Sequence, residues 1–115
     1  MTSRHLVNIA AHLPRMADSQ PDTPAIIFPR GNVRLTFREL DDLSDRIAHG
    51  LTTIGINRGI RTVLMVPPGP EFFALTFALF KVAAVPVLVD PGLGVKNLKA
   101  CLDEARPQAF IGISK

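Results

Sequence analysis

Three short apolar segments, beginning near residues 62, 85 and 109, constrain the fold of this chain more than any other feature. They lie about 23 residues apart, which accommodates a strand, a crossover helix and two short loops. Successive residues within each segment are apolar, as in parallel strands that helices cover on both faces. The spacing therefore predicts an α/β fold containing a βαβαβ unit. At 115 residues the chain is long enough for one modest domain, residues 1–115.

The helices of this unit are predicted between the strands. Pro70 is tolerated in the first turn of a helix, so a helix is expected to begin there and to carry the Phe-rich segment that follows. A second helix is expected over Val95–Ala105, with Pro107 as its stop. The predicted strands are Thr62–Val66, Val85–Val89 and Phe110–Ile113.

The part of the chain before this unit predicts a helix and then a short β-hairpin. Apolar residues recur every three or four positions, which favours an amphipathic helix, at Leu6, Ile9, Ala10, Leu13 and Ala17. Ala25–Phe28 and Val33–Leu35 are short apolar runs, and Pro29–Asn32 between them has the composition of a turn.

A helix start is predicted at Thr36. Its hydroxyl can accept a hydrogen bond from the amide three residues on, and the carboxylate of Glu39 can reach back to the Thr36 amide, which together make a capping box. An apolar stripe from Leu40 to Ile54 continues this helix. Gly55 supplies a left-handed residue that would end it.

Charge and apolar content argue against a nucleic-acid groove and against a membrane span. The net charge is +3, but basic residues alternate with acids and form no run of like charge. The apolar segment Phe72–Val89 is interrupted by Lys81 and by Pro86, so it is interpreted as a helix followed by a strand.

The single cysteine and the start of the chain suggest a reducing compartment. Cys101 has no partner for an internal disulfide and is predicted to lie buried on an apolar helix face. No export signal is recognised after Arg4, because Asn8 and His12 interrupt the apolar stretch. We expect a cytoplasmic location.

The histidines, aspartates and serines, which often serve in catalysis or metal binding, are not spaced along the sequence as in a known type of active site. The histidines lack partners at metal-ligand spacing, the aspartates lie near a helix start where they favour the helix dipole, and the serines lack a base. These residues are His5, His12 and His49, Asp41, Asp42 and Asp45, and Ser44 and Ser114. The sequence assigns no catalytic, cofactor-binding or metal-binding residue.

Gly92–Gly94 occupies the place of a dinucleotide-binding turn, between a strand and a helix. Asn97 stands where the third glycine belongs, and no acid follows at the distance that would hold a ribose. We interpret the segment as an ordinary strand-to-helix turn.

Two segments resemble the first two core motifs of the AMP-forming synthetase and ligase superfamily. They are Leu35–Leu40, which reads LTFREL, and Leu79–Pro91, which reads LFKVAAVPVLVDP. Order and separation also match, as do shorter stretches at Asn8–Ala10, Gln20–Ala25 and Met65–Phe72. The resemblance covers nearly the whole chain and is greatest to the fatty-acyl-CoA ligase branch that includes the olefin β-lactone synthetases.

The resemblance implies the amino-terminal portion of a larger domain. A parent enzyme of this family uses ATP and Mg²⁺ to convert a carboxylate to an acyl-adenylate, and then passes the acyl group to CoA or closes it internally. The phosphate-binding loop, the magnesium motif, the ribose-binding aspartate and the catalytic lysine of the family match nothing in this sequence. We therefore expect no turnover from the chain alone.

Two positions depart from the family pattern. Ile60 stands where an acid commonly follows Gly59, and Ala83 replaces a glycine after the helix that carries Lys81. If that helix ends in a left-handed residue, alanine there would cost on the order of 1 kcal/mol.

Three functions remain open on the sequence alone. The first is an inactive amino-terminal fragment of an acyl-CoA synthetase. The second is a non-catalytic partner that completes a separately encoded remainder through an open sheet edge. The third is an independent α/β binding module with its pocket at the carboxyl ends of the strands, near Pro67–Pro70 and Asp90–Gly94.

Overall fold

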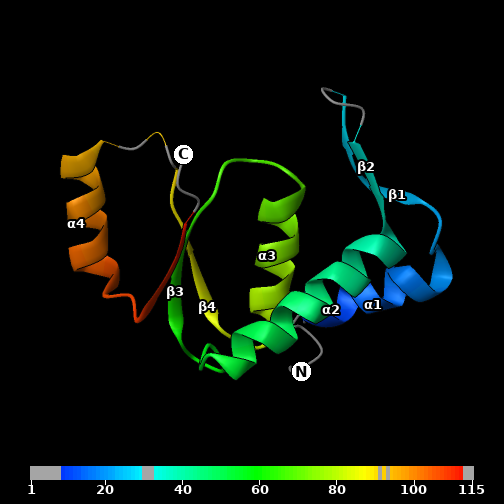
Figure 1. The fold of residues 1–115 in the computed structure, drawn as a ribbon, viewed down its shortest axis with the longest axis horizontal. Coiled ribbons are helices and arrows are strands. Elements are labelled where there is room, and N and C mark those ends of the chain that lie inside the picture. The colour runs from blue at the N-terminus through cyan, green and yellow to red at the C-terminus, as the bar shows by residue number, and fades with distance from the viewer. Residues whose placement is uncertain (1–8, 30–32, 91, 93, 113–115) are drawn as a thin grey trace, which may run out of the picture.

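The computed structural model describes residues 9–29, 33–90, 92 and 94–112 (Figure 1). The elements run in the order α1 Ile9–Ser19, β1 Pro24–Phe28, β2 Val33–Thr36, α2 Phe37–Thr53, β3 Arg61–Met65, α3 Pro70–Lys81, β4 Val85–Leu88, α4 Val95–Ala105 and β5 Ala109–Gly112. The predicted α/β fold is confirmed, with strand bounds shifted by a residue or two. The predicted hairpin turn at 30–32 lies outside the described residues.

The three strands of the βαβαβ unit form a parallel sheet in the order β4-β3-β5. Since β4 and β5 lie on opposite sides of β3, right-handed crossovers require α3 and α4 to lie on opposite faces of the sheet. Figure 1 shows this arrangement, with α4 on one side of the strands and α3 on the other. The unit is a small doubly wound sheet.

The main core lies between β3, α2 and α3. Leu64 of β3 and Leu79 of α3 are completely buried there. Ile60, which stands where the family commonly has an acid, packs against the same cluster, so its apolar side chain has a structural use. Ala109 and Ile111 of β5 also contact it.

A second core joins the amino-terminal elements to α3. Leu13 of α1, Leu40 of α2 and Ala74 of α3 are buried together, with side chains of the β1-β2 hairpin packed around them. The hairpin is antiparallel, as predicted, and projects beside α1 and α2 (Figure 1). Because α2 and α3 contribute to both cores, these two helices connect the hairpin to the parallel sheet.

The predicted capping box at the start of α2 is present. Thr36 Oγ1 accepts a hydrogen bond from the Glu39 amide at 3.1 Å, and Glu39 Oε1 accepts one from the Thr36 amide at 2.9 Å. Two donors that the first helical turn leaves without partners are satisfied in this way. The chain therefore leaves β2 and enters α2 without an intervening loop.

The apolar segment 72–89 is divided as predicted. Helix α3 ends at Lys81, and β4 begins at Val85. Within the described residues, no helix has both the length and the apolar character that crossing a bilayer requires.

Two helices end in the same backbone motif, one with glycine and one with alanine. After α2, Gly55 has φ of +92°, and the amides of Gly55 and Ile56 donate to the carbonyls of Thr52 and Leu51. This is a Schellman motif.

The end of α3 repeats this motif with a different residue. Ala83 has φ of +61°, and the amides of Ala83 and Ala84 donate to the carbonyls of Phe80 and Leu79, both at 3.0 Å. The replacement of a family glycine by alanine therefore falls on a left-handed residue, where the Cβ atom crowds the backbone.

We expect Ala83→Gly to raise the free energy of unfolding by about 1 kcal/mol, because glycine adopts this backbone conformation without the steric cost. Gly55→Ala is the matched control. A Cβ built on Gly55 meets no atom within 4 Å, so only the backbone conformation should matter there. It should lower stability by a similar amount. Urea unfolding of both variants measures the changes, and a loss of stability in Ala83→Gly would contradict the expectation.

Candidate functional site

One crevice lies where the connections of two neighbouring strands diverge. β3 leads into α3 on one face of the sheet, and β4 leads towards α4 on the other (Figure 1). Ligands of open α/β sheets bind at such a point, at the carboxyl ends of the strands. The pocket location expected near Pro67–Pro70 and Asp90–Gly94 agrees with this crevice.

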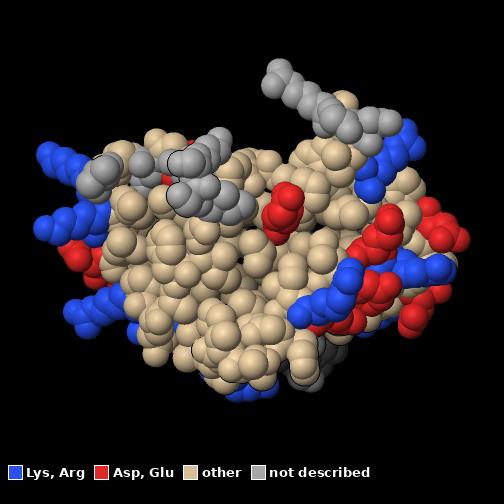
Figure 2. All heavy atoms as spheres, viewed as in Figure 1, with Lys and Arg blue, Asp and Glu red and all other residues tan. Residues whose placement is uncertain are grey.

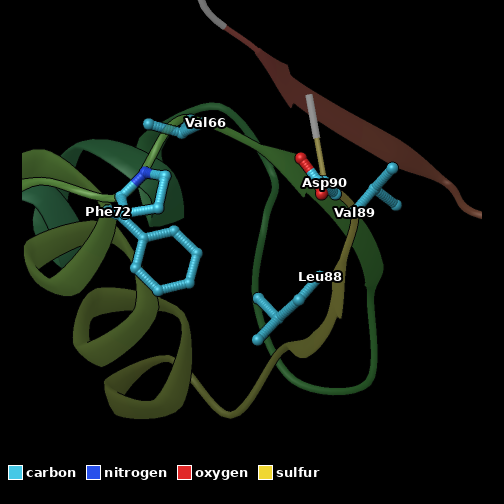
Figure 3. Close-up of a pocket in the computed structure, with 6 residues that line it drawn as sticks. Val66, Phe72, Leu88, Val89 and Asp90 are labelled. Carbon is cyan, nitrogen blue, oxygen red and sulfur yellow. The ribbon is translucent and has the colours of Figure 1, made fainter. Parts of the chain in front are cut away.

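Side chains from both strand ends and from α3 line the crevice, which has a volume of about 260 Å³. The lining residues are Val66, Pro68, Phe72, Leu88, Val89 and Asp90. Figure 3 shows the Phe72 ring and the Leu88 side chain on two sides of this space, with the Asp90 carboxylate at the end of β4. Because the lining is apolar apart from one acid, the crevice suits an uncharged apolar group.

The carboxylate of Asp90 has a structural hydrogen bond. Its Oδ1 accepts from the Gly92 amide at 2.8 Å, an arrangement that turns the chain after β4. Among the described residues, no Lys or Arg lines the crevice, and a phosphate there would meet like charge from Asp90. The residues present therefore do not fit the phosphates of ATP or CoA.

A second hollow lies between the hairpin and the proline-rich loop that precedes α3. Its volume is about 640 Å³, and its lining residues are Phe28, Pro29, Val33, Pro68, Gly69 and Pro70. Pro68 lines both hollows, so the loop 67–70 forms a wall between them. Among the described residues that line the two hollows, only Asp90 carries an ionisable side chain.

Lys81 and two aspartates of α2 form a charged cluster, which sequence analysis missed. Lys81 Nζ lies 2.6 Å from Asp41 Oδ1 and 2.6 Å from Asp45 Oδ1, and it also donates to the Asp41 carbonyl at 3.0 Å. The expected role at the helix dipole is wrong for Asp41 and Asp45, because the first turn of α2 contains only Glu39 as an acid and the partner of both aspartates is a lysine on α3. Only the one-turn spacing of Asp41 and Asp45 could have signalled that they share a cation.

The remaining candidates of the sequence do not come together as a site. Ser44 is completely buried and donates to the Asp41 carbonyl at 3.0 Å, so it is a packed helix residue. His12 and His49 are exposed, and Cys101 is half-buried rather than buried as predicted. His5 and Ser114 lie outside the described residues.

No three acidic, histidine or cysteine side chains lie close enough to hold a metal ion in the part of the chain that the structure describes. Figure 2 shows charged side chains of both signs at the two ends of the visible face, and a broad middle with few of them over the sheet and α3. The described residues offer mainly apolar packing surfaces on this face.

The chain belongs to the AMP-binding enzyme family, which it matches over residues 13–114. Among its relatives, the olefin β-lactone synthetase of Xanthomonas campestris pv. campestris is 58% identical over 94% of this chain. The long-chain-fatty-acid–CoA ligase FadD13 of Mycobacterium tuberculosis is 30% identical over 90% of it. Both comparisons agree with the family inferred from the two core motifs.

Solved structures share the fold of this chain. The N-terminal domain of FACL13 from Mycobacterium tuberculosis superposes with a TM-score of 0.85 at 30% identity, and the match covers 91% of this chain and 26% of that one. The N-terminal subdomain of NpsA from Klebsiella oxytoca, 23% identical with a TM-score of 0.86, has the same fold. The chain spans about a fifth of the length of the curated relatives, with 21% of each covered.

Proposed function

We propose that this chain is the amino-terminal part of an ATP-dependent, AMP-forming enzyme that activates a fatty carboxylate, and that alone it has no activity. The identity of 58% with an olefin β-lactone synthetase carries this proposal. In the whole enzyme, the carboxylate would attack the α-phosphate of ATP and release pyrophosphate to leave an acyl-adenylate. A thiol of CoA, or a hydroxyl on the β-carbon of the acyl chain, would then displace AMP to give a thioester or a β-lactone.

The residues for these steps would come from outside the part described here. Among the described residues, no Lys or Arg lines either crevice, and Asp41 and Asp90 are engaged in structural contacts. In the whole enzyme this chain would then have a structural role, because its fold supports the rest of the adenylate-forming domain. Assembly and activity would take place in a reducing compartment such as the cytoplasm.

A chimeric enzyme tests this proposal. In the Xanthomonas campestris synthetase, the segment that matches this chain is replaced by residues 1–115. We expect the chimera to catalyse ATP–pyrophosphate exchange with a β-hydroxy fatty acid, because 58% identity should preserve the packing surfaces. The same exchange assay of the 115-residue chain alone should give no signal above background.

Two controls make the result decisive. The Xanthomonas enzyme without the segment should be inactive, which shows that the segment is needed. A chimera with the 30% identical segment of FadD13 should show less exchange, because fewer packing residues are shared. A folded chimera with residues 1–115 that fails to exchange, or exchange by the chain alone, would contradict the proposal.

A non-catalytic partner of a separately encoded remainder is the second candidate. The observation in its favour is that both outer strands of the parallel sheet, β4 and β5, lack a neighbouring strand in the described residues. Mixing the 115-residue chain with the Xanthomonas remainder should then restore exchange without a covalent link. Tight binding of ATP or acyl-CoA by the chain alone, measured by calorimetry, would instead favour an independent binding module.

A further inference from the structure

An apolar cavity of about 240 Å³ lies in the second core, where α1, β1, α2 and α3 meet. Most of its wall consists of Leu13, Ile26, Phe37, Leu40, Phe73 and Phe77. Leu13 and Leu40 are 2% exposed, whereas His12 at the margin is exposed, so the cavity opens to solvent beside α1. It shares no lining residue with the crevice at the strand ends or with the hollow beside the hairpin. The cavity is therefore a separate site.

A β-bulge at Ala25 creates part of this space. Pro24 pairs with Thr36 and Ile26 pairs with Leu35, so Ala25 and Ile26 together oppose a single residue of β2. Successive residues of a regular strand point to opposite faces, but Ala25 and Ile26 both line the cavity. Because the side chain of Ala25 is a single methyl group, the additional residue leaves space that a larger side chain would fill.

Backbone hydrogen bonds fix the wall beside the bulge. The Phe37 amide donates to the Thr23 carbonyl at 3.0 Å, and the Arg38 amide donates to the Pro21 carbonyl at 3.2 Å. These bonds attach the first turn of α2 to the residues just before β1, and the capping box at Thr36 fixes the same turn. A shift of the hairpin that closed the cavity would break them, so the cavity should persist in the folded protein.

The lining determines which kind of molecule the cavity accepts. Among the described lining residues only His12 has a polar side chain, so a charged ligand would lose its hydration without a partner in the interior. The Phe73 and Phe77 rings have aromatic partners outside the cavity, Phe72 and Phe80, with centroids 5.4 and 6.1 Å away. A ring inside the cavity would add a further aromatic contact to each. Apolar cavities of about 150 Å³ stay dry and take up benzene, so 240 Å³ is sufficient for one ring.

We propose that this cavity is a binding site for an uncharged molecule with one aromatic ring, in addition to the proposed function. The bulge at Ala25 provides the space, and the Phe side chains provide the surface that a ring contacts. Because such a molecule binds the folded chain and not the unfolded one, its binding also stabilises the fold.

Titration of the 115-residue chain with benzene tests the site, with ¹H–¹³C NMR of the methyl groups as the measurement. We expect saturable shifts at Leu13, Ile26 and Leu40, because the ring current of the bound molecule acts on nearby protons. The dissociation constant should be about 1 mM, which lies within the limit for a ligand of this size. The methyl groups of Leu64, in the main core, should not shift. Benzoate should bind at least tenfold more weakly, because its carboxylate would be buried without a partner.

Two alanine substitutions give a matched comparison. Ala25→Leu places three more carbon atoms at the cavity wall and should weaken benzene binding at least tenfold. Ala100→Leu makes the same change at an exposed residue of α4, on the other face of the sheet from α3 (Figure 1), and should leave the dissociation constant within twofold of that of the unmodified chain. Thermal unfolding without benzene establishes that both variants fold. The methyl shifts of the unmodified chain do not depend on the folding of Ala25→Leu.

Several results would overturn the inference. They are the absence of saturable shifts, shifts at Val66 and Leu88 of the crevice instead, equal binding of benzoate, or unchanged affinity in Ala25→Leu. Benzene binding that occurs only after deletion of residues 2–8 would make the start of the chain the occupant and would also contradict it. In each case an active chimera would leave the proposed function standing, because pyrophosphate exchange does not require benzene to bind.

Discussion

Lys81→Met should lower the free energy of unfolding by about 3 kcal/mol. The Lys81 side chain is 10% exposed and that of Asp41 is 17% exposed, so removal of the ammonium group leaves a carboxylate away from water without its partner. Methionine retains the length of the apolar stem, so the loss should arise from charge rather than from packing. Urea-induced unfolding followed by circular dichroism measures this change.

The two aspartates should respond differently, and they provide the controls. The Asp45 side chain is 62% exposed, so Asp45→Asn should cost less than about 1 kcal/mol. The double variant Lys81→Met/Asp41→Asn should recover part of the stability, because it no longer buries a charge without a partner. A Lys81→Met protein as stable as the unmodified chain would show that solvent reaches Asp41 freely.

Leu64→Ala should lower the free energy of unfolding by about 3 kcal/mol, as much as Lys81→Met does. Leu64 is completely buried on the central strand and packs in the main core, so alanine would leave a cavity among side chains of two helices. The expected range for such a change is about 2 to 5 kcal/mol, depending on how far the neighbours relax. The midpoint of urea unfolding should fall while its slope stays the same.

Leu88→Ala is the matched control for Leu64→Ala. Leu88 lies beside Leu64 in the register of β3 and β4, but it is 55% exposed. The same truncation at this position should cost less than about 1 kcal/mol, since little apolar surface leaves water there. Similar losses from both substitutions would mean that β4 is covered by another part of the protein in solution.

The family and the order of the elements could be predicted from the sequence with good accuracy. Thr36 and Glu39 start α2 through contacts three residues apart, and Gly55 ends it through its own backbone conformation. The apolar runs at 61–65, 85–88 and 109–112 became strands because their spacing left room for one crossover helix each. The position of the crevice also followed, since it depends only on where parallel strands end.

The character of the site was harder to predict, because it depends on side chains that the fold brings together. Asp41 and Lys81 are 40 residues apart in the chain, and only the packing of α2 on α3 makes them neighbours. The half-buried state of Cys101 likewise depends on how closely α4 covers the sheet. No pattern within one helix contains that information.

The sequence by itself determined the helix limits, the strand positions and the family. Caps, turns and periodic apolar side chains, which act within about six residues, set the limits of the helices, and the spacing of the three apolar runs set the strands. The tertiary structure alone decided the order β4-β3-β5, the left-handed conformation of Ala83 and the Lys81 cluster. Those features depend on which strand lies beside which, and that choice is made by the packing of the whole chain.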